Sequence, residues 1–253
     1  MSIILPSFAG IAKPSGGGSS FSNSFTAALD GTNDYLNIPA STDFDFGAGD
    51  FSFTFWMRAT SRENYGGLFY RASTYRLKFQ ASDSVMNLQM VGIELAGIIN
   101  HGSSLLNNWH HIMIIRDGTS VTGYVDNSVS ATKSVSTQTL SSAGNPMFWG
   151  DNGAQNLGGQ LDEISIFNRA LSSSERTQLY NSGASYDIGT NFTGADAPIA
   201  FYRCGDDSGD TDSGGGTVDN GDTIGTIKNV INPGTHDMSG VNGPTYSTAN
   251  SPP

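Results

Sequence analysis

Two neighbouring carboxylates, Asp162 and Glu163 in the segment GGQLDEISIF, are the first residues to consider for hydrolytic chemistry. Retaining glycosidases place two carboxyl groups about 5 Å apart, so that both act on one glycosidic bond. This segment has the pattern of a β-strand, in which adjacent side chains point to opposite faces. The two carboxylates therefore cannot act together, and we predict that the protein is not an enzyme.

The four histidines, His101, His110, His111 and His236, raise the question of a metal site or a catalytic base. His110 and His111 are adjacent in a predicted strand, so they point to opposite faces and cannot chelate one ion. No Ser-His-Asp order or nucleophile elbow accompanies them. We interpret His110 and His111 as structural strand residues.

Three aromatic residues in or beside predicted loops, Tyr65, Tyr70 and Trp149, could stack on the faces of sugar rings. Packing in the core is the commoner fate of such side chains in a β-sandwich. The sequence therefore predicts a glycan-binding role for these residues and leaves core packing as the competing interpretation.

The composition excludes several classes of partner. The net charge is −11, which disfavours nucleic acid and anionic lipid surfaces. The one cysteine, Cys204, cannot form an internal disulfide and is expected to be a small buried side chain. No run of about 18 apolar residues occurs, so we expect no membrane span, and the N-terminal residues lack the pattern of a secretory signal.

Short apolar segments separated by Gly, Asn, Asp or Ser recur along residues 24–183, which predicts a sandwich of two antiparallel sheets. In DFSFTFWMRA, Phe51, Phe53 and Phe55 alternate with polar residues, as in a strand with one buried face. The Asp117-Gly118 pair predicts a tight hairpin turn.

One segment, LDEISIFNRALSSSERTQLYNSG, predicts a strand followed by a short helix over about residues 173–181. Ser172 and Glu175 have the spacing of a capping box, and Gly183 suits the left-handed position past the helix end. A helix of two turns is marginal alone and must dock on the sandwich. The predicted docking side chains are Leu171, Leu179 and Tyr180.

The N-terminal residues 1–23 have a different pattern from the rest of the chain. Five large apolar side chains within residues 3–11 precede the Gly/Ser-rich stretch PSGGGSS, which is typical of a flexible linker. We interpret residues 1–23 as an arm and linker. Docking on a partner and loose packing on the chain's own domain both remain open.

Four blocks together resemble the laminin-G-like jelly rolls of the concanavalin A-like lectin/glucanase superfamily. They are SFTAALDGTNDYLNIP, DFSFTFWMR, WHHIMIIRDGTSVTGYVDN and GGQLDEISIFNRALSSSERTQLYNSG. The resemblance implies an all-β, two-sheet antiparallel jelly roll in which the short helix plugs one end of the sandwich. The E-x-D-x-x-E strand motif of the superfamily's glucanases does not occur here.

The C-terminal segment, residues 198–253, resembles the block with which many members of the family begin. Its position after the helix predicts a circular permutation, which chains tolerate when the two ends of a domain lie close together. A truncated second repeat is the alternative, but so short a segment cannot bury a core of its own. We therefore expect one domain over residues 24–253, with 198–253 completing it.

The resemblance also implies a structural calcium ion, because the family often holds one where the first strand meets the last. The matching positions are Asp30, Asp34 and Asp162, which offer the oxygen ligands that Ca²⁺ prefers. The alternative is that Asp30 and Asp34 form Asx turns and Asp162 caps a strand end. The acidic run DDSGDTD, residues 206–212, has no EF-hand spacing and is interpreted as a solvated loop.

The C-terminal arrangement is similar to laminin-G-like proteins of tailed-phage virions. This similarity implies a non-enzymatic virion structural protein, such as a capsid decoration or tail protein located in the virion. Its expected partners are other virion proteins such as the major capsid protein, further copies of itself in a homo-oligomer, and a cell-surface glycan. The alternative is a soluble carbohydrate-binding module or lectin.

Overall fold

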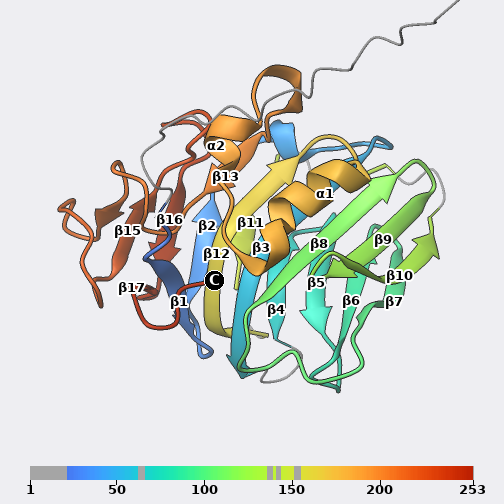
Figure 1. The fold of residues 1–253 in the computed structure, drawn as a ribbon, viewed down its shortest axis with the longest axis horizontal. Coiled ribbons are helices and arrows are strands. Elements are labelled where there is room, and N and C mark those ends of the chain that lie inside the picture. The colour runs from blue at the N-terminus through green and yellow to red at the C-terminus, as the bar shows by residue number, and fades with distance from the viewer. Residues whose placement is uncertain (1–21, 62–65, 136–138, 141–143, 151–154, 253) are drawn as a thin grey trace, which may run out of the picture.

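The computed structural model describes residues 22–61, 66–135, 139–140, 144–150 and 155–252. Two antiparallel sheets face each other across one core, which confirms the predicted all-β sandwich (Figure 1). Residues 1–21 of the predicted arm and linker (residues 1–23) and the predicted ligand-binding residue Tyr65 lie outside the described residues.

The first sheet has nine strands. In spatial order they are β14 (Thr211–Asp212), β15 (Ile224–Ile227), β16 (Met238–Val241), β2 (Tyr35–Ile38), β11 (Met147–Trp149), β4 (Gly67–Arg71), β5 (Tyr75–Phe79), β6 (Val85–Met90) and β7 (Ile93–Asn100).

The second sheet has eight strands. Seven of them run in the order β10 (Ser128–Ser134), β9 (Ser120–Val125), β8 (His110–Asp117), β3 (Phe51–Ser61), β12 (Gly158–Phe167), β1 (Thr26–Asp30) and β17 (Thr245–Ser247). The eighth, β13 (Ala200–Tyr202), pairs with residues Ile164–Ile166 of β12, beyond the point where β1 has left that strand.

The alternation in β3 has the predicted consequence. Phe51, Phe53 and Phe55 are fully buried in the core between the sheets, whereas Ser52 and Thr54 point to the outer face of the eight-stranded sheet. The turn at Asp117-Gly118 joins β8 to β9 as predicted, and Gly118 has a φ of 57°. Cys204 is buried, as expected.

The helix α1 (Ser173–Tyr180) begins at the predicted capping box: the Ser172 side chain accepts from Glu175 N, and the Glu175 side chain accepts from Ser172 N. Its C-terminus differs from the prediction, because Asn181, with a φ of 45°, takes the left-handed position in place of Gly183. Asparagine tolerates this conformation better than most residues, which explains the earlier end.

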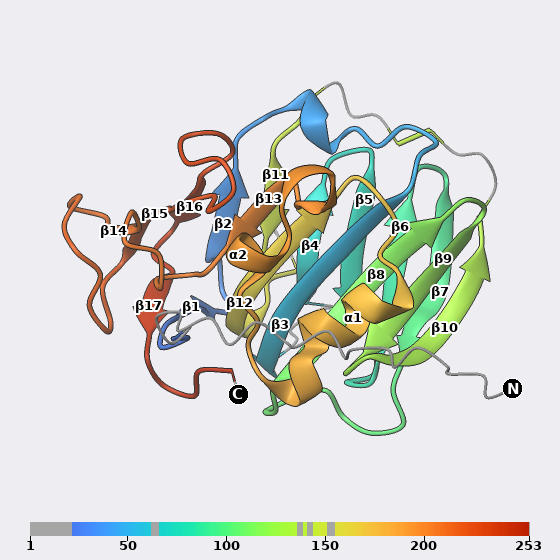
Figure 2. The same ribbon diagram turned by 45° about the horizontal axis from the view of Figure 1, so that its top comes forward.

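The position of α1 corrects the prediction that it plugs one end of the sandwich. It lies across the outer face of the eight-stranded sheet, over β3 and β8 (Figures 1 and 2). Leu171 and Leu179 are buried there in a second apolar cluster with Met113 and Ile115 of β8, and Tyr180 is partly buried against the same cluster. The core between the two sheets is a separate cluster.

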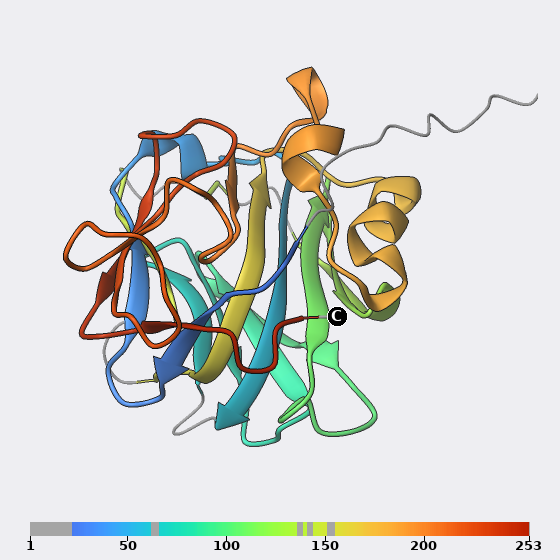
Figure 3. The same ribbon diagram turned by 60° about the vertical axis from the view of Figure 1, so that its left-hand side comes forward.

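Short helical turns follow α1 on the same side of the molecule (Figure 3). The helix α2 (Ile188–Asn191) buries Ile188 in the second cluster, so the structure has one more short helix than predicted. The 3₁₀ turns are η2 (Asn181–Gly183) and η3 (Gly194–Asp196) here, and η1 (Thr42–Phe44) after β2.

The C-terminal residues complete both sheets. β16 pairs with β2 in one sheet, and β17 pairs with β1 in the other, so strands from the two ends of the chain lie side by side (Figures 1 and 3). Tyr202, Ile227, Met238 and Tyr246 from this block are fully buried in the core. Residues 198–252 thus belong to the same sandwich. The circular permutation concerns the strand order of relatives and stays a prediction.

Candidate functional site

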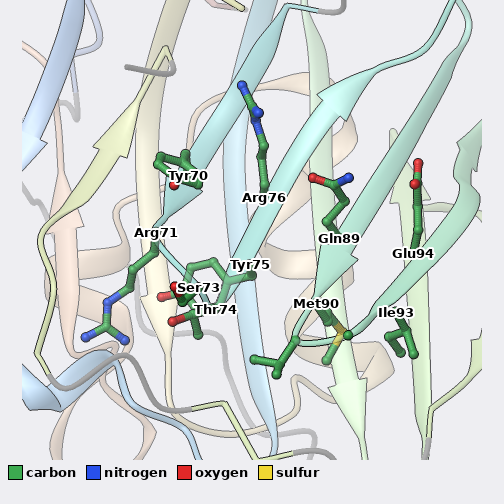
Figure 4. A pocket seen from close by; sticks show the side chains of 12 residues that line it. Tyr70, Arg71, Ser73, Thr74, Tyr75, Arg76, Gln89, Met90, Ile93 and Glu94 are labelled. Carbon is green, nitrogen blue, oxygen red and sulfur yellow. The ribbon is translucent and has the colours of Figure 1, made fainter. Parts of the chain in front are cut away.

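A continuous row of side chains crosses the outer face of the nine-stranded sheet. Because β-strand side chains alternate, burial of Phe69, Leu77 and Leu88 in the core turns their neighbours outward. The strand register places these neighbours directly opposite one another, in the order Phe148, Tyr70, Arg76, Gln89 and Glu94. Figure 4 shows the last four of them side by side on the sheet.

A pocket of about 500 Å³ opens on this row, between the β4–β5 and β6–β7 hairpins. Its walls include the polar side chains of Tyr70, Arg76, Gln89 and Glu94 and the apolar side chains of Met90, Val91 and Ile93 (Figure 4). Val91 is 39% exposed, which is unusual among the large aliphatic residues that the structure describes. The mixture of apolar surface and convergent polar groups is typical of a small-ligand site.

Tyr70 lies at the centre of an aromatic group on this face. Its ring is 6.4 Å from that of Phe148 with an angle of 19° between the planes, and the Arg76 guanidinium carbon is 5.3 Å from the Tyr70 centroid. Phe148 in turn makes an edge contact with Tyr35 at 5.4 Å. All four side chains are partly exposed. The structure thus places Tyr70 where a ligand can reach it.

Trp149 corrects the prediction of a sugar-stacking role. It is fully buried and contacts Phe53, Phe55 and Phe69 in the core, with centroids 5.1–6.4 Å apart. The competing interpretation, core packing, holds for this residue. Its neighbour Phe148, which the sequence pattern had not singled out, occupies the outer face instead. The alternation within MFW is the signal that distinguishes the two.

The three aspartates of the predicted calcium site do not come together. Asp30 lies opposite Gly158 of β12, and Asp162 is four residues farther along that strand, roughly 13 Å away. Asp30 Oδ1 accepts from Thr32 N at 2.7 Å, an Asx turn, and Asp34 Oδ2 accepts from Asp30 N. In the described ranges no three His, Cys, Asp or Glu side chains form a group able to hold a metal.

Asp162 and Glu163 differ from a regular strand pair. Glu163 has a φ of 47°, and the pairing with β3 shifts register here, so the assumed alternation is interrupted by a bulge. Both carboxyls are buried, at 0% and 3% exposure, and the negative charge of Asp206 raises the pKa of both. Desolvation raises the pKa of both groups, to about 8 for Glu163.

The acidic loop at residues 206–212 is largely buried or partly buried, which corrects its interpretation as a solvated loop. Asp206 accepts hydrogen bonds from Ser24 N and Phe25 N, and so fixes the two residues that directly precede β1. Asp210 is 4% exposed and accepts from Gly205 N and Lys228 N. These carboxylates accept hydrogen bonds from backbone N–H groups that would otherwise have no partner.

His110 and His111 face opposite sides of the sheet, as predicted. The His111 ring packs against Trp56 and Tyr180 on the outer face, with centroids 5.0 and 6.2 Å away, and these two rings also contact each other. The His110 ring contacts His101 and Asp126 instead.

Within the described part of the chain, no helix is long and apolar enough to cross a membrane.

The sequence profile of the concanavalin A-like lectin/glucanases superfamily matches residues 30–175, more than half of the chain. The chain therefore belongs to this superfamily, and within it to the laminin-G-like domains. A search of curated proteins found no significant match.

Two solved structures illustrate the shared fold. A candidate carbohydrate-binding protein from Bacteroides ovatus ATCC 8483 is similar with a TM-score of 0.66 and 14% identity over 90% of this chain, which spans 61% of that structure. Domain 4 of an extracellular arabinanase from Geobacillus stearothermophilus, solved with arabinotriose, is similar with a TM-score of 0.51 and 18% identity, covering 61% of this chain and 76% of that domain. At these identities the likeness establishes the fold.

Proposed function

We propose that the protein binds a glycan in the pocket on the outer face of the nine-stranded sheet. The observation that carries this proposal is the row in which the partly exposed aromatic side chain of Tyr70 adjoins Arg76, Gln89 and Glu94. An aromatic ring offers an apolar surface to a sugar face, and the guanidinium, amide and carboxylate can bond its hydroxyls. The carbohydrate-binding neighbours of the same fold support this choice of ligand.

The proposed activity is binding rather than hydrolysis. Glycoside hydrolysis requires two carboxyl groups that both reach the scissile bond. Asp162 and Glu163, which the sequence singled out for this comparison, are both buried on β12 of the other sheet. Among the side chains of the pocket, Glu94 is the one carboxylate.

Replacing Tyr70 by alanine should weaken glycan binding at least tenfold, because it removes the aromatic surface from the pocket. The ligand is found first on a glycan array, and its affinity for wild-type and Y70A protein is then measured by calorimetry. A tenfold loss corresponds to about 1.4 kcal/mol, a modest demand for one aromatic contact.

The matched control is Y35A, because Tyr35 lies on the same face and contacts Phe148 but does not line the pocket. Y35A should keep the wild-type affinity within about twofold, a difference below 0.5 kcal/mol. Equal affinity of Y70A and wild type would place the glycan elsewhere, and absence of any bound glycan from a broad array would contradict the proposal as a whole.

We further propose that this binding takes place on a virion surface, with the protein docked on other virion proteins. Two sequence features support the setting: the similarity of residues 198–253 to phage laminin-G-like proteins, and the apolar stretch of residues 3–11 before a Gly/Ser-rich linker. At about 25 cal/mol per Å², burial of five large apolar side chains on a partner would contribute several kcal/mol. A soluble carbohydrate-binding module is the alternative.

Removal of residues 1–20 distinguishes these two settings. If the arm docks the protein, the truncated chain should keep its melting temperature and its glycan affinity but fail to co-purify with a multi-subunit particle. Light scattering and co-purification measure the assembly, and calorimetry measures stability. A full-length chain that stays monomeric and never associates with a particle would favour the soluble module.

A further inference from the structure

Two histidines meet where the chain passes from one sheet to the other. His101 directly follows β7 of the nine-stranded sheet, and His110 is the first residue of β8 in the eight-stranded sheet. Their ring centroids are 5.4 Å apart with an angle of 60° between the planes. The pair lies outside the glycan pocket, and nothing in the proposed binding role requires it.

The His110 ring is held in one tautomer. Its Nδ1 is 2.8 Å from Asp126 Oδ2, and Asp126 Oδ1 is itself fixed by a hydrogen bond from His111 N at 2.8 Å. A carboxylate accepts, so Nδ1 carries a proton, and in the neutral ring Nε2 then presents a lone pair. His110 is only 9% exposed, and its buried Nε2 has no hydrogen-bond partner among the described residues.

His101 has the same arrangement. Its Nδ1 is 3.1 Å from the carbonyl oxygen of Ser103, which can only accept, so the hydrogen bond between them belongs to the tautomer with the proton on Nδ1. The Ser103 hydroxyl lies 3.3 Å from the same nitrogen. The Nε2 of His101 makes no hydrogen bond within the described part of the chain, and its side chain is partly exposed, which provides a path from solvent.

In these neutral tautomers both imidazoles have Nδ1 anchored to an oxygen acceptor and Nε2 free to bind a metal. This is the pattern of metal-binding histidines, whose second nitrogen donates to a carboxylate or a backbone carbonyl. We propose that His101 and His110 bind one transition-metal ion, such as Zn²⁺, Ni²⁺ or Cu²⁺, through their Nε2 atoms.

The separation of the rings agrees with a shared ion. With a metal–nitrogen distance of about 2.0–2.1 Å and a tetrahedral angle, the centroids of two imidazoles on one zinc ion lie about 5 Å apart. The measured separation is 5.4 Å. Imidazole nitrogen suits zinc, nickel and copper, whereas calcium and magnesium prefer oxygen ligands.

Water completes the coordination of this ion, because the described residues provide no third His, Cys, Asp or Glu to the pair. A two-histidine site with open positions binds more weakly than a closed structural site of four protein ligands. It leaves room for an oxygen ligand from outside the chain. The buried lone pair of His110 Nε2 also gains a partner that the protein itself does not supply.

The test uses full-length protein without a polyhistidine tag, stripped with a chelator. Zn²⁺ should bind with one ion per chain in calorimetry and should raise the melting temperature in proportion to the logarithm of its concentration. H101A should bind at least tenfold more weakly. Copper(II) electron paramagnetic resonance should show two imidazole nitrogens in wild type and one in H101A, a result that does not depend on stability.

His236 provides the matched control, because its Nε2 is already hydrogen-bonded to Asp43 at 2.7 Å. H236A should bind zinc as wild type does, and calcium should replace zinc in neither protein. The proposal is wrong if H101A binds zinc as tightly as wild type does, if H236A is the variant that loses binding, or if wild type binds no zinc at millimolar concentration. In each of these cases the two rings only pack against each other.

Discussion

Deletion of residues 198–253 should leave the remaining chain insoluble. The deletion removes β13, β14, β15, β16 and β17 from the two sheets, so β1 and β2 become unpaired edges. It also removes Tyr202, Met238 and Tyr246 from the core, which exposes the apolar side chains that they cover. Exposed strand edges beside apolar surface promote aggregation. Expression of the truncated chain, followed by size-exclusion chromatography, measures the outcome.

The control for this deletion is the chain without residues 1–20, which keeps every strand of the described residues and should remain soluble with a cooperative melting transition. The contrast between the two truncations depends on the placement of β16 beside β2 and β17 beside β1. A monomeric, cooperatively melting fragment that ends at residue 197 would contradict this placement, because such a fragment would have a complete core without the C-terminal block.

The sequence predicted the parts of the fold that depend on local periodicity. Alternation in β3 identified its buried face, the Asp117-Gly118 pair identified a hairpin, and Ser172 with Glu175 identified the start of α1. Each of these features is determined by residues that are close in sequence. The face on which α1 docks is determined by Met113 and Ile115 of a distant strand, and local periodicity carries no such information.

The candidate site was only partly predictable for a related reason. The composition of the β4 and β11 segments singled out Tyr70 and Trp149 equally, although one ring faces outward and the other faces the core. Which face is buried follows from the partner strands. The row from Tyr70 to Glu94 depends on the register of four strands, and a register cannot be seen in any one strand.

The bulge at Asp162 and Glu163 shows a different limit. A strand of ten residues with a regular pattern predicts strict alternation, and nothing in the segment marks the left-handed backbone at Glu163. The bulge arises where β1 leaves β12 and β13 takes its place, between Leu161 and Ile164. The segments that pair with β12 around the bulge are β1, β3 and β13, and all three lie more than thirty residues away in the sequence.

Stability should fall as the pH rises from about 5 to about 8, because Glu163 must keep its proton in the folded state. Desolvation raises its pKa from the ordinary value of 4.5 to about 8, against the hydrogen bond from Tyr186 N and the charge of Arg203, while Asp206 raises it further. Between these values the folded chain holds a proton that the unfolded chain has released. This contribution to the free energy of unfolding is complete below the pKa of Glu163 in the unfolded chain. It is lost as the pH reaches the pKa of Glu163 in the folded chain.

Replacement of Glu163 by glutamine should remove this part of the pH dependence. Glutamine keeps an oxygen that accepts from Tyr186 N and never ionises, so E163Q should match wild type near pH 5 and exceed it near pH 9. One pKa unit is worth about 1.4 kcal/mol, which places the gain on the order of several kcal/mol at pH 9. Urea unfolding at a series of pH values measures it.

Two other groups determine how much of the slope remains in E163Q. Desolvation also raises the pKa of Asp162, and it raises that of Asp210 to about 7, so the variant should retain a smaller decline over the same range. E94Q is the matched control, because Glu94 is exposed and its change to glutamine should leave the wild-type slope. If E163Q and wild type lose stability in parallel between pH 5 and 9, Glu163 is ionised in the folded protein and its charge is neutralised by a partner, most directly by Arg203.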